Sequence, residues 1–480
     1  MGIFNSTFRA VVASLAGLAL AACASTGGPL GLSPQQEQAL GQQQHPQILA
    51  AFGGEIDDPQ LNAYVRRVFN RLMASDPALP DMEIYVLDSP VINAMAVPGH
   101  VYVTRGLLAL ANSEAELAGV IGHEIGHNQR RHIAKRVSRT NLAQIGAVAA
   151  AILTGDQQTA QAIGQGAQLY LLSFSREQEY ESDLVGTRLL ASSGYDPLGA
   201  ARFLNTLGAW TNLEAQIAGV QQPPEYLKTH PNSANRVQRA AQEANALRQA
   251  GSASDEVNRN VFLNAIDGMI YGDDPQTQGY IEGRTFIHPQ IGLSFTAPMG
   301  FELANSSQAV TGRSSSGAQM QFTGASSEKA PAALIEQEIS QSLGVNLGPA
   351  RSGNINGRPA AMGRARANAN GAAVDVTAYV IRWQGTTNYM FLWVTPANQT
   401  AQLDRALQQS VESLRNVDPG SLRVPDPIRV DVVTAQSRDT ASSLARYMAF
   451  PSHQLERFAI MNGLGSAASI QAGQRYKLVR

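Results

Sequence analysis

Residues 114–132 read EAELAGVIGHEIGHNQRRH and contain the pattern His-Glu-x-x-His at positions 123–127. It predicts one helix over residues 115–136, on which His123 and His127 lie one turn apart and point the same way. Two imidazoles in that arrangement can bind one Zn²⁺ ion. Glu124 projects beside them and is placed to take a proton from a water that the zinc activates.

Two glycines distinguish this helix from an ordinary exposed one. Gly122 and Gly126 each lower helix stability by about 1 kcal/mol relative to alanine. An exposed helix with two solvated histidines, which is the alternative interpretation, has no reason to contain them. Close packing of another segment against the helix explains both positions, so the sequence favours a buried metal-binding helix.

A catalytic zinc ion needs a third protein ligand beside an open position. One solution is a further histidine six residues after the second one, but that position is Ile133, and His132 is one residue short. We therefore expect His132 to be solvated or to lie behind a ligand. The other solution is a glutamate on a later helix.

Residues 175–183, which read SREQEYESD, supply such a glutamate. Glu179 and Asp183 are four residues apart on one helix face, so Glu179 can bind zinc while Asp183 orients a ligand imidazole. Glu177 and Glu181 compete for the ligand role, and we expect both to be solvated or salt-bridged. The predicted site is one Zn²⁺ per chain, held by His123, His127 and Glu179.

The HExxH helix, combined with a later Glu-x-x-Ser-Asp segment, resembles the M48 (Ste24/HtpX-like) gluzincin family of zinc metallopeptidases. Two further stretches resemble that family: NAMAVPG at 93–99, followed by VYVTRGLL at 101–108, and His230-Pro231 with Arg236. The resemblance covers about residues 33–245. It implies a mainly helical protease domain with a small sheet.

The resemblance also implies roles for these stretches. His230 and Arg236 are expected to assist catalysis beside Glu124, and in soluble periplasmic members the matching histidine can cap the zinc and hold the enzyme latent. His230 has a plainer interpretation too, as a helix-entry residue before Pro231 that never meets metal. The first stretch matches the strand that lines the family's cleft, where substrate backbone would add as a neighbouring strand. Its expected substrate-binding residues are Asn93, Ala94, Met95 and Ala96.

The amino terminus is predicted to be a lipoprotein signal peptide over residues 1–22. Its apolar run at 10–22 is too short to cross a hydrocarbon layer of ~30 Å, and it ends in Leu-Ala-Ala-Cys23. This resembles a bacterial lipobox, whose cysteine receives a diacylglycerol thioether, and it explains where the sole cysteine stands. An ordinary secretory signal with an incidental cysteine is the alternative. Ala24 follows, which by resemblance to Gram-negative lipoproteins favours a lipid anchor in the outer membrane.

Length and composition limit the possible classes of protein. A chain of 480 residues predicts about three domains. Only 15% of the residues are charged and the net charge is −2, which excludes electrostatic capture of nucleic acid as the main activity. A single cysteine excludes an internal disulfide framework and a cysteine-based zinc site.

The sequence predicts an α+β protein with three domains. Residues 33–248 form the metallopeptidase domain, and beyond a linker at 250–255 the pattern changes to strands. Residues 258–416 are expected to form an α+β domain with a hairpin at 374–383 and 388–395, and its opening resembles PsbP/Mog1-like domains. Residues 428–480 resemble a LysM module with the order strand, helix, helix, strand, which implies binding of peptidoglycan; a LysM-like fold used only for packing is the alternative.

Together these expectations describe a zinc endopeptidase of the bacterial periplasm, tethered to the outer membrane through lipid on Cys23. It would hydrolyse peptide bonds in misfolded or maturing envelope proteins. Two alternatives remain open: a chaperone or assembly factor of the envelope that seldom cleaves, and a peptidoglycan-binding scaffold. The expected partners are unfolded or assembling envelope polypeptides, the membrane and peptidoglycan, with no nucleic acid.

Overall fold

The computed structural model describes residues 32–135, 174–218, 226–227, 230–231, 234–251, 254–306, 309–369, 371–465 and 469–480. The chain divides into two compact units. We call residues 273–427 the small unit, and the described residues of 24–272 and 428–480 the large unit. Cys23 and the signal peptide predicted at 1–22 lie outside the described residues. Within the described ranges, none of the helices has both the length and the hydropathy needed to cross a bilayer.

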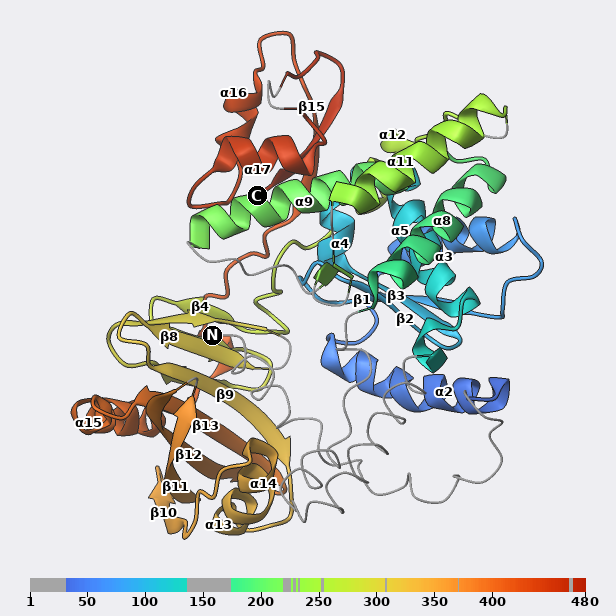
Figure 1. Ribbon diagram of the computed structural model, residues 1–480. Helices are drawn as coiled ribbons and strands as arrows, with labels where there is room; N and C mark the ends of the chain where they lie inside the picture. The colour runs from blue at the N-terminus through green and yellow to red at the C-terminus, as the bar shows by residue number, and fades with distance from the viewer. Residues whose placement is uncertain are drawn as a thin grey trace. The chain divides into compact units, whose positions relative to one another are not determined.

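Helices dominate the large unit and pack around a small sheet (Figure 1). Its helices before residue 273 are α2 (Pro34–Ala51), α3 (Pro59–Met73), α4 (Arg105–Leu110), α5 (Glu114–Gln129), α8 (Arg176–Ser192), α9 (Gly199–Ala218), α11 (Ala234–Gln249) and α12 (Arg259–Ile266). Its sheet comprises β1 (Glu83–Leu87), β3 (His100–Thr104) and β2 (Ala94–Val97), in that spatial order. β1 and β3 are parallel, and β2 runs antiparallel to β3 at the edge of the sheet.

The prediction of one helix over residues 115–136 is wrong at the C-terminal end. α5 begins after Ser113, whose side chain accepts a hydrogen bond from the backbone N–H of Glu116, and it ends at Gln129. Arg131 then adopts a left-handed backbone with φ 54°, which a continuing helix cannot contain. Its guanidinium bonds Glu37 Oε1 of α2 at 2.7 Å, a contact that holds this turn in place.

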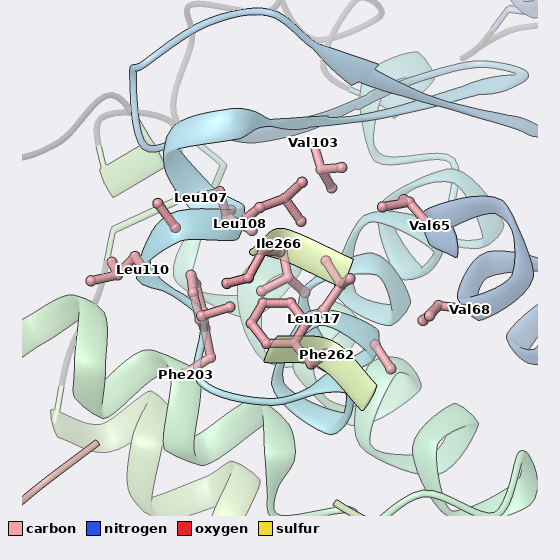
Figure 2. Packing of buried hydrophobic residues seen from close by; sticks show 14 of the residues in the cluster. Val65, Val68, Val103, Leu107, Leu108, Leu110, Leu117, Phe203, Phe262 and Ile266 are labelled. Carbon is pink, nitrogen blue, oxygen red and sulfur yellow. The ribbon is translucent and has the colours of Figure 1, made fainter. Parts of the chain in front are cut away.

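α12 belongs to the large unit, whereas the sequence placed residues from 258 onward in the middle domain. Phe262, Leu263 and Ile266 form an apolar stripe that is fully buried. Figure 2 shows Phe262 and Ile266 among Leu107, Leu117 and other side chains of one core cluster. Burial of its apolar face therefore decides which unit α12 joins, and the position of the linker at 250–255 does not.

The C-terminal segment completes the same core. It contains β15 (Val430–Thr434), α16 (Ala441–Ala445), α17 (Gln454–Met461) and β16 (Arg475–Val479), the order expected from the sequence. β15 pairs with β16 antiparallel, and Thr440 caps α16 through its side chain. Several of its apolar side chains belong to the same core cluster as side chains of α3, α4 and α5: Val430, Ala435, Leu444, Phe458, Tyr476 and Leu478.

The small unit is inserted into the large unit through a paired stem. Residues 268–271 lead into it and 428–430 lead out, and the two strands of chain are hydrogen-bonded to each other. The backbone N–H of Tyr271 donates to the Ile428 carbonyl at 2.7 Å, and that of Val430 donates to the Met269 carbonyl at 2.8 Å. Arg105 of α4 fixes the stem through the carbonyls of Ile270 and Gly272.

Strands form most of the small unit. Its larger sheet has the order β10 (Arg351–Ile355), β11 (Arg358–Ala369), β12 (Ala372–Gln384), β13 (Thr387–Pro396), β9 (Gln319–Ser326), β8 (Val310–Ser314) and β7 (Phe301–Ala304). The smaller sheet has the order β14 (Arg415–Asn416), β6 (Leu293–Thr296), β5 (Thr285–His288) and β4 (Tyr280–Glu282). Its helices are α13 (Pro331–Ala333), the π-helical turn at Leu334–Ile339, α14 (Ser340–Leu343) and α15 (Thr400–Glu412). β12 and β13 form the hairpin predicted at 374–383 and 388–395, and the chain is α+β as expected.

Candidate metal centre

Close packing of α5 against α8 builds the centre. A Cβ atom added at Gly126 would lie 3.0 Å from the Cα of Ser182 on α8, and one added at Gly122 would lie 3.1 Å from the Cα of Gly186. Gly186 in turn meets the backbone nitrogen of His123, at 2.9 Å from where its Cβ would stand. The helices can approach this closely because Gly122 and Gly186 carry no side chain where they meet, and Gly126 carries none opposite Ser182. Close packing is the explanation expected for these two α5 glycines.

Four buried side chains meet at this contact. His123 and His127 come from α5, Glu179 from the first turn of α8, and His230 from the turn before α11. Their ligand atoms all lie within 4.8 Å of one another. The structure thus brings the two motif histidines to Glu179 and adds His230, although 107 residues separate it from His123.

The spacing of these atoms fits a tetrahedral ion. Zn–N and Zn–O bonds of about 2.0–2.1 Å imply ligand–ligand distances of about 3.3–3.4 Å at tetrahedral angles. His123 Nε2 lies 2.9 Å from His127 Nε2, 3.3 Å from His230 Nδ1 and 3.5 Å from Glu179 Oε2. Glu179 Oε1 lies 3.5 Å from His127 Nε2 and 3.0 Å from His230 Nδ1. Three imidazoles and one carboxylate are also the donors that zinc prefers, so these residues fit the ion.

His230 lies inside the cluster, and its plainer interpretation as a residue remote from metal does not describe the structure. Only 1% of its surface is exposed. Its backbone N–H donates to the Tyr226 carbonyl at 2.8 Å, and the Tyr226 ring stacks on its imidazole with centroids 4.6 Å apart. The backbone of Tyr226 is tied in turn to the Ile92 carbonyl, next to β2.

Asp183 supports His123 from behind. Its Oδ1 lies 2.8 Å from His123 Nδ1, so this ring can donate from Nδ1 and keep Nε2 for a metal. Burial alone would raise the pKa of the Asp183 carboxyl, but the Arg236 guanidinium outweighs burial and holds that pKa below its usual value. Asp183 therefore remains a carboxylate, the form that can accept the imidazole proton.

Arg236 clamps the acidic residues from one side. It donates to Asp183 in a two-bond contact of 2.7 and 2.8 Å, and its Nη1 lies 2.5 Å from Glu179 Oε2. Nη1 also donates to the Pro231 carbonyl at 3.2 Å, which ties the His230 segment to the same guanidinium. Burial would raise the pKa of Glu179, but His230 and Arg236 hold it well below its usual value. The structure places Arg236 behind the ligands, as a positioning residue.

His127 is supported by His132, which takes the second of the two positions expected for it, behind a ligand. His132 is buried, not solvated; its Nδ1 lies 3.0 Å from His127 Nδ1, and its Nε2 lies 2.9 Å from Glu181 Oε2. A helix continued past Gln129 would turn His132 by about 140° from His127, since each residue adds about 100°. The left-handed turn at Arg131 removes that obstacle. Glu181 is salt-bridged as expected, and Glu177 is exposed.

Glu124 faces the cluster without a hydrogen-bond partner. Both of its carboxylate oxygens are buried, and neither has a partner among the described residues. Its Oε1 lies 3.6 Å from His230 Nε2. Burial raises the pKa of this carboxyl above its usual value. A buried carboxylate with free acceptor capacity beside a metal site is suited to accept a proton.

The expected substrate strand lies at the edge of the small sheet. β2 pairs with β3 on one side, through Ala94–Val103, Met95–Tyr102 and Ala96–Val101. Asn93 precedes it, and its backbone is held by Thr104 Oγ1 at 3.0 Å. An edge strand is the place where an extended peptide can add to a sheet. The structure brings this edge strand close to α5, the helix that carries the two motif histidines.

Among solved structures, the solution structure of cyanobacterial PsbP (CyanoP) from Synechocystis sp. PCC 6803 covers 29% of this chain and 98% of its own. The two are 12% identical, with a TM-score of 0.23. That score is too low to support a conclusion on the small unit, and its PsbP/Mog1-like character stays a prediction.

Comparison with known sequences identifies the region that holds the centre. Over 236 residues the chain is 32% identical to a β-barrel assembly-enhancing protease of Yersinia pestis, which covers 47% of each sequence. Over 172 residues it is 37% identical to the mitochondrial metalloendopeptidase OMA1 of Arabidopsis thaliana, or 35% of this chain and 32% of that one. The chain thus spans at most about half the length of these relatives. Residues 59–244, which carry all four ligand candidates, match the model of peptidase family M48.

Proposed function

We propose that this chain is a zinc-dependent endopeptidase of the bacterial cell envelope. One observation carries the proposal: three imidazoles and one carboxylate converge at tetrahedral spacing beside Glu124, whose buried carboxylate accepts no hydrogen bond from the described residues. His123, His127 and Glu179 would hold the ion, since Asp183 and His132 already support the far nitrogens of the two histidines. When bound, zinc would polarise the scissile carbonyl and lower the pKa of water.

The chain's own residues would move the proton. Glu124 accepts a proton from the attacking water as the carbon–oxygen bond forms, and then donates it to the leaving amine as the peptide bond breaks. Its burial favours this role, because the raised pKa of the carboxyl brings it nearer to the pH at which the reaction runs. Arg236 keeps Glu179 and Asp183 charged and in place during the cycle.

The closed cluster supports a latent state. A catalytic zinc ion needs one position open for substrate, and His230 Nδ1 occupies the fourth corner of the cluster. We propose that the His230 segment withdraws when substrate adds beside β2. The same closure favours a second candidate function, a chaperone or assembly factor that seldom cleaves.

Casein degradation separates the two. The metal-loaded chain should degrade casein, o-phenanthroline should stop it, and Zn²⁺ should restore it. Glu124→Gln should keep one equivalent of zinc and lose activity, by about 10²-fold or more, while Glu177→Gln, at an exposed position of α8, should behave as wild type. A fully active Glu124→Gln chain would overturn the mechanism. Zinc binding without cleavage by wild type would favour the chaperone.

Location and substrates are proposed on other grounds. The lipobox-like sequence at Cys23 supports a lipid anchor in the outer membrane, with the chain in the periplasm. The name of the Yersinia pestis relative refers to β-barrel assembly, which supports misfolded or assembling envelope polypeptides as substrates. Cys23→Ala should release the chain from the membrane fraction; unchanged membrane attachment would refute the anchor.

Peptidoglycan binding by residues 428–480 is proposed on the resemblance to LysM modules and the matching β15–α16–α17–β16 order. Because this segment shares the core of the large unit, the test should use the full chain and not the isolated segment. Pelleting with purified peptidoglycan supports binding, and a chain that stays in the supernatant argues for a packing role alone.

A further inference from the structure

The C-terminal segment places a charged side chain inside the large unit. Lys477, on β16, is fully buried. Its ammonium donates to the carbonyls of Ala109 at 2.8 Å and Ala111 at 2.5 Å, and lies 3.4 Å from the Leu110 carbonyl. The three N–H donors of an ammonium thus face three acceptors at one point of the chain.

Those carbonyls belong to the last two residues of α4 and to Ala111, which begins the connection to α5. α4 ends at Leu110, and Ser113 caps the start of α5. Between them, the backbone N–H of Asn112 donates to Glu116 Oε2 at 3.0 Å, and its carbonyl accepts from Arg259 Nη1 at 2.7 Å. Buried Glu116 and partly buried Arg259 thus hold the two backbone groups of Asn112.

The C-terminal segment is itself braced at this point. The backbone N–H of Lys477 donates to Asn462 Oδ1 at 2.7 Å, and Asn462 Nδ2 donates back to the Lys477 carbonyl at 2.9 Å. α17 also lies along α9, where Arg457 pairs with Glu214 at 2.6 Å (Figure 1). Lys477 thus extends from a rigid element and not from a loose tail.

Burying a charged side chain in a core costs desolvation free energy. Burial lowers the pKa of Lys477, which expresses the cost of holding a cation away from water. A well-packed apolar side chain of similar size would often be as stable or more so. Unlike an apolar side chain, an ammonium forms directional hydrogen bonds, and these fix the positions of three particular carbonyls.

We propose that Lys477 is a positioning residue of the metal centre. It fixes the chain at Ala109–Ala111, and so the start of α5, the helix that presents His123 and His127. The distance from the cap of α5 to His123 is about 15 Å along a rigid helix, at 1.5 Å per residue. The inference rests on the proposed metal site, and it assigns residues 428–480 to that site's support.

Zinc retention tests this role. Lys477→Met and Leu444→Ala each remove one buried side chain of the C-terminal segment, but only the first removes hydrogen bonds to Ala109 and Ala111. Zinc release to a chromogenic chelator is measured at 25 °C, well below the unfolding midpoint of either variant. We expect release up to about tenfold faster in Lys477→Met, because loss of a residue directly behind a metal ligand costs about 10–100-fold and Lys477 acts one step further away. Leu444→Ala should release zinc at the wild-type rate.

Equal release from the two variants, or wild-type release from Lys477→Met, would overturn the proposal. A wild-type chain that holds no zinc would instead refute the proposed function. If Lys477→Met does not fold, hydrogen exchange of the wild type decides: amides of β16 and of the first turn of α5 should open together as denaturant rises. Opening of β16 at lower denaturant, with α5 still protected, would refute the role.

Discussion

Replacing Arg236 by methionine tests whether one cation holds the acidic side of the centre. Arg236 is 1% exposed and contacts two carboxylates, Asp183 through two bonds and Glu179 through Nη1. Methionine keeps much of the length and apolar stem of arginine but brings no charge. Arg236→Met therefore leaves two buried carboxylates without their cation and changes the packing little.

The expected loss of unfolding free energy follows from the two buried carboxylates that lose their cation. Breaking a buried ion pair by removing one partner costs about 3–5 kcal/mol, because the remaining charge stays buried. For domains of 150–250 residues each kcal/mol lowers the midpoint of thermal unfolding by about 2–4 °C, so Arg236→Met should lower it by about 6–20 °C. Added zinc should reduce the difference, because the ion gives Glu179 another cation.

Calorimetry of the metal-free chain in EDTA measures this midpoint, and a second scan with zinc measures the rescue. Arg239→Met is the matched control: it lies on the same helix α11, is exposed, and stacks over the Tyr180 ring at 4.0 Å. Such an exposed contact is worth about 0.5–1 kcal/mol. An Arg236→Met chain that unfolds within 2 °C of the control (about the shift of 1 kcal/mol or less) would refute the clamp.

Three further predictions follow from the fold and the site. His230→Ala should keep zinc, held by the other three ligands, and should raise casein degradation if His230 closes the centre; slower degradation with zinc retained would show that it assists catalysis instead. Gly126→Ala should lower stability by about 1–3 kcal/mol and reduce zinc content, because its Cβ would meet Ser182 of α8; wild-type zinc content would contradict the packing argument. Replacing residues 273–427 by a short Gly-Ser linker should leave a folded, zinc-binding large unit, because the stem at 268–271 and 428–430 already pairs; an insoluble product would contradict it.

Local patterns predicted the parts of the site that lie on single helices. His123, Glu124 and His127 follow from helical spacing alone, and Glu179 with Asp183 follows from a second helix of the same period. The hairpin predicted at 374–383 and 388–395 is likewise formed, by β12 and β13. These features depend on neighbours in the sequence, which is why a single chain reveals them.

Contacts between distant segments could not be predicted in the same way. The burial of His132 depends on a left-handed backbone at Arg131, a residue type that gives no signal for it. The membership of α12 in the large unit depends on which core its apolar stripe meets. The role of Arg236 behind the ligands depends on where α11 crosses α8, which no spacing in the sequence records.

The path of the chain through the large unit sets the order in which the protein can fold. Lys477 bonds carbonyls that lie 366 to 368 positions earlier, and the small unit is made between the two. Contacts of such long sequence separation form late, after the loop between them has closed. As the chain is synthesised, the small unit can fold first, while the large unit waits for residues 428–480 to emerge. A chain interrupted before that point lacks the last support of α5, so the peptidase region would be completed only in molecules whose synthesis has passed Lys477.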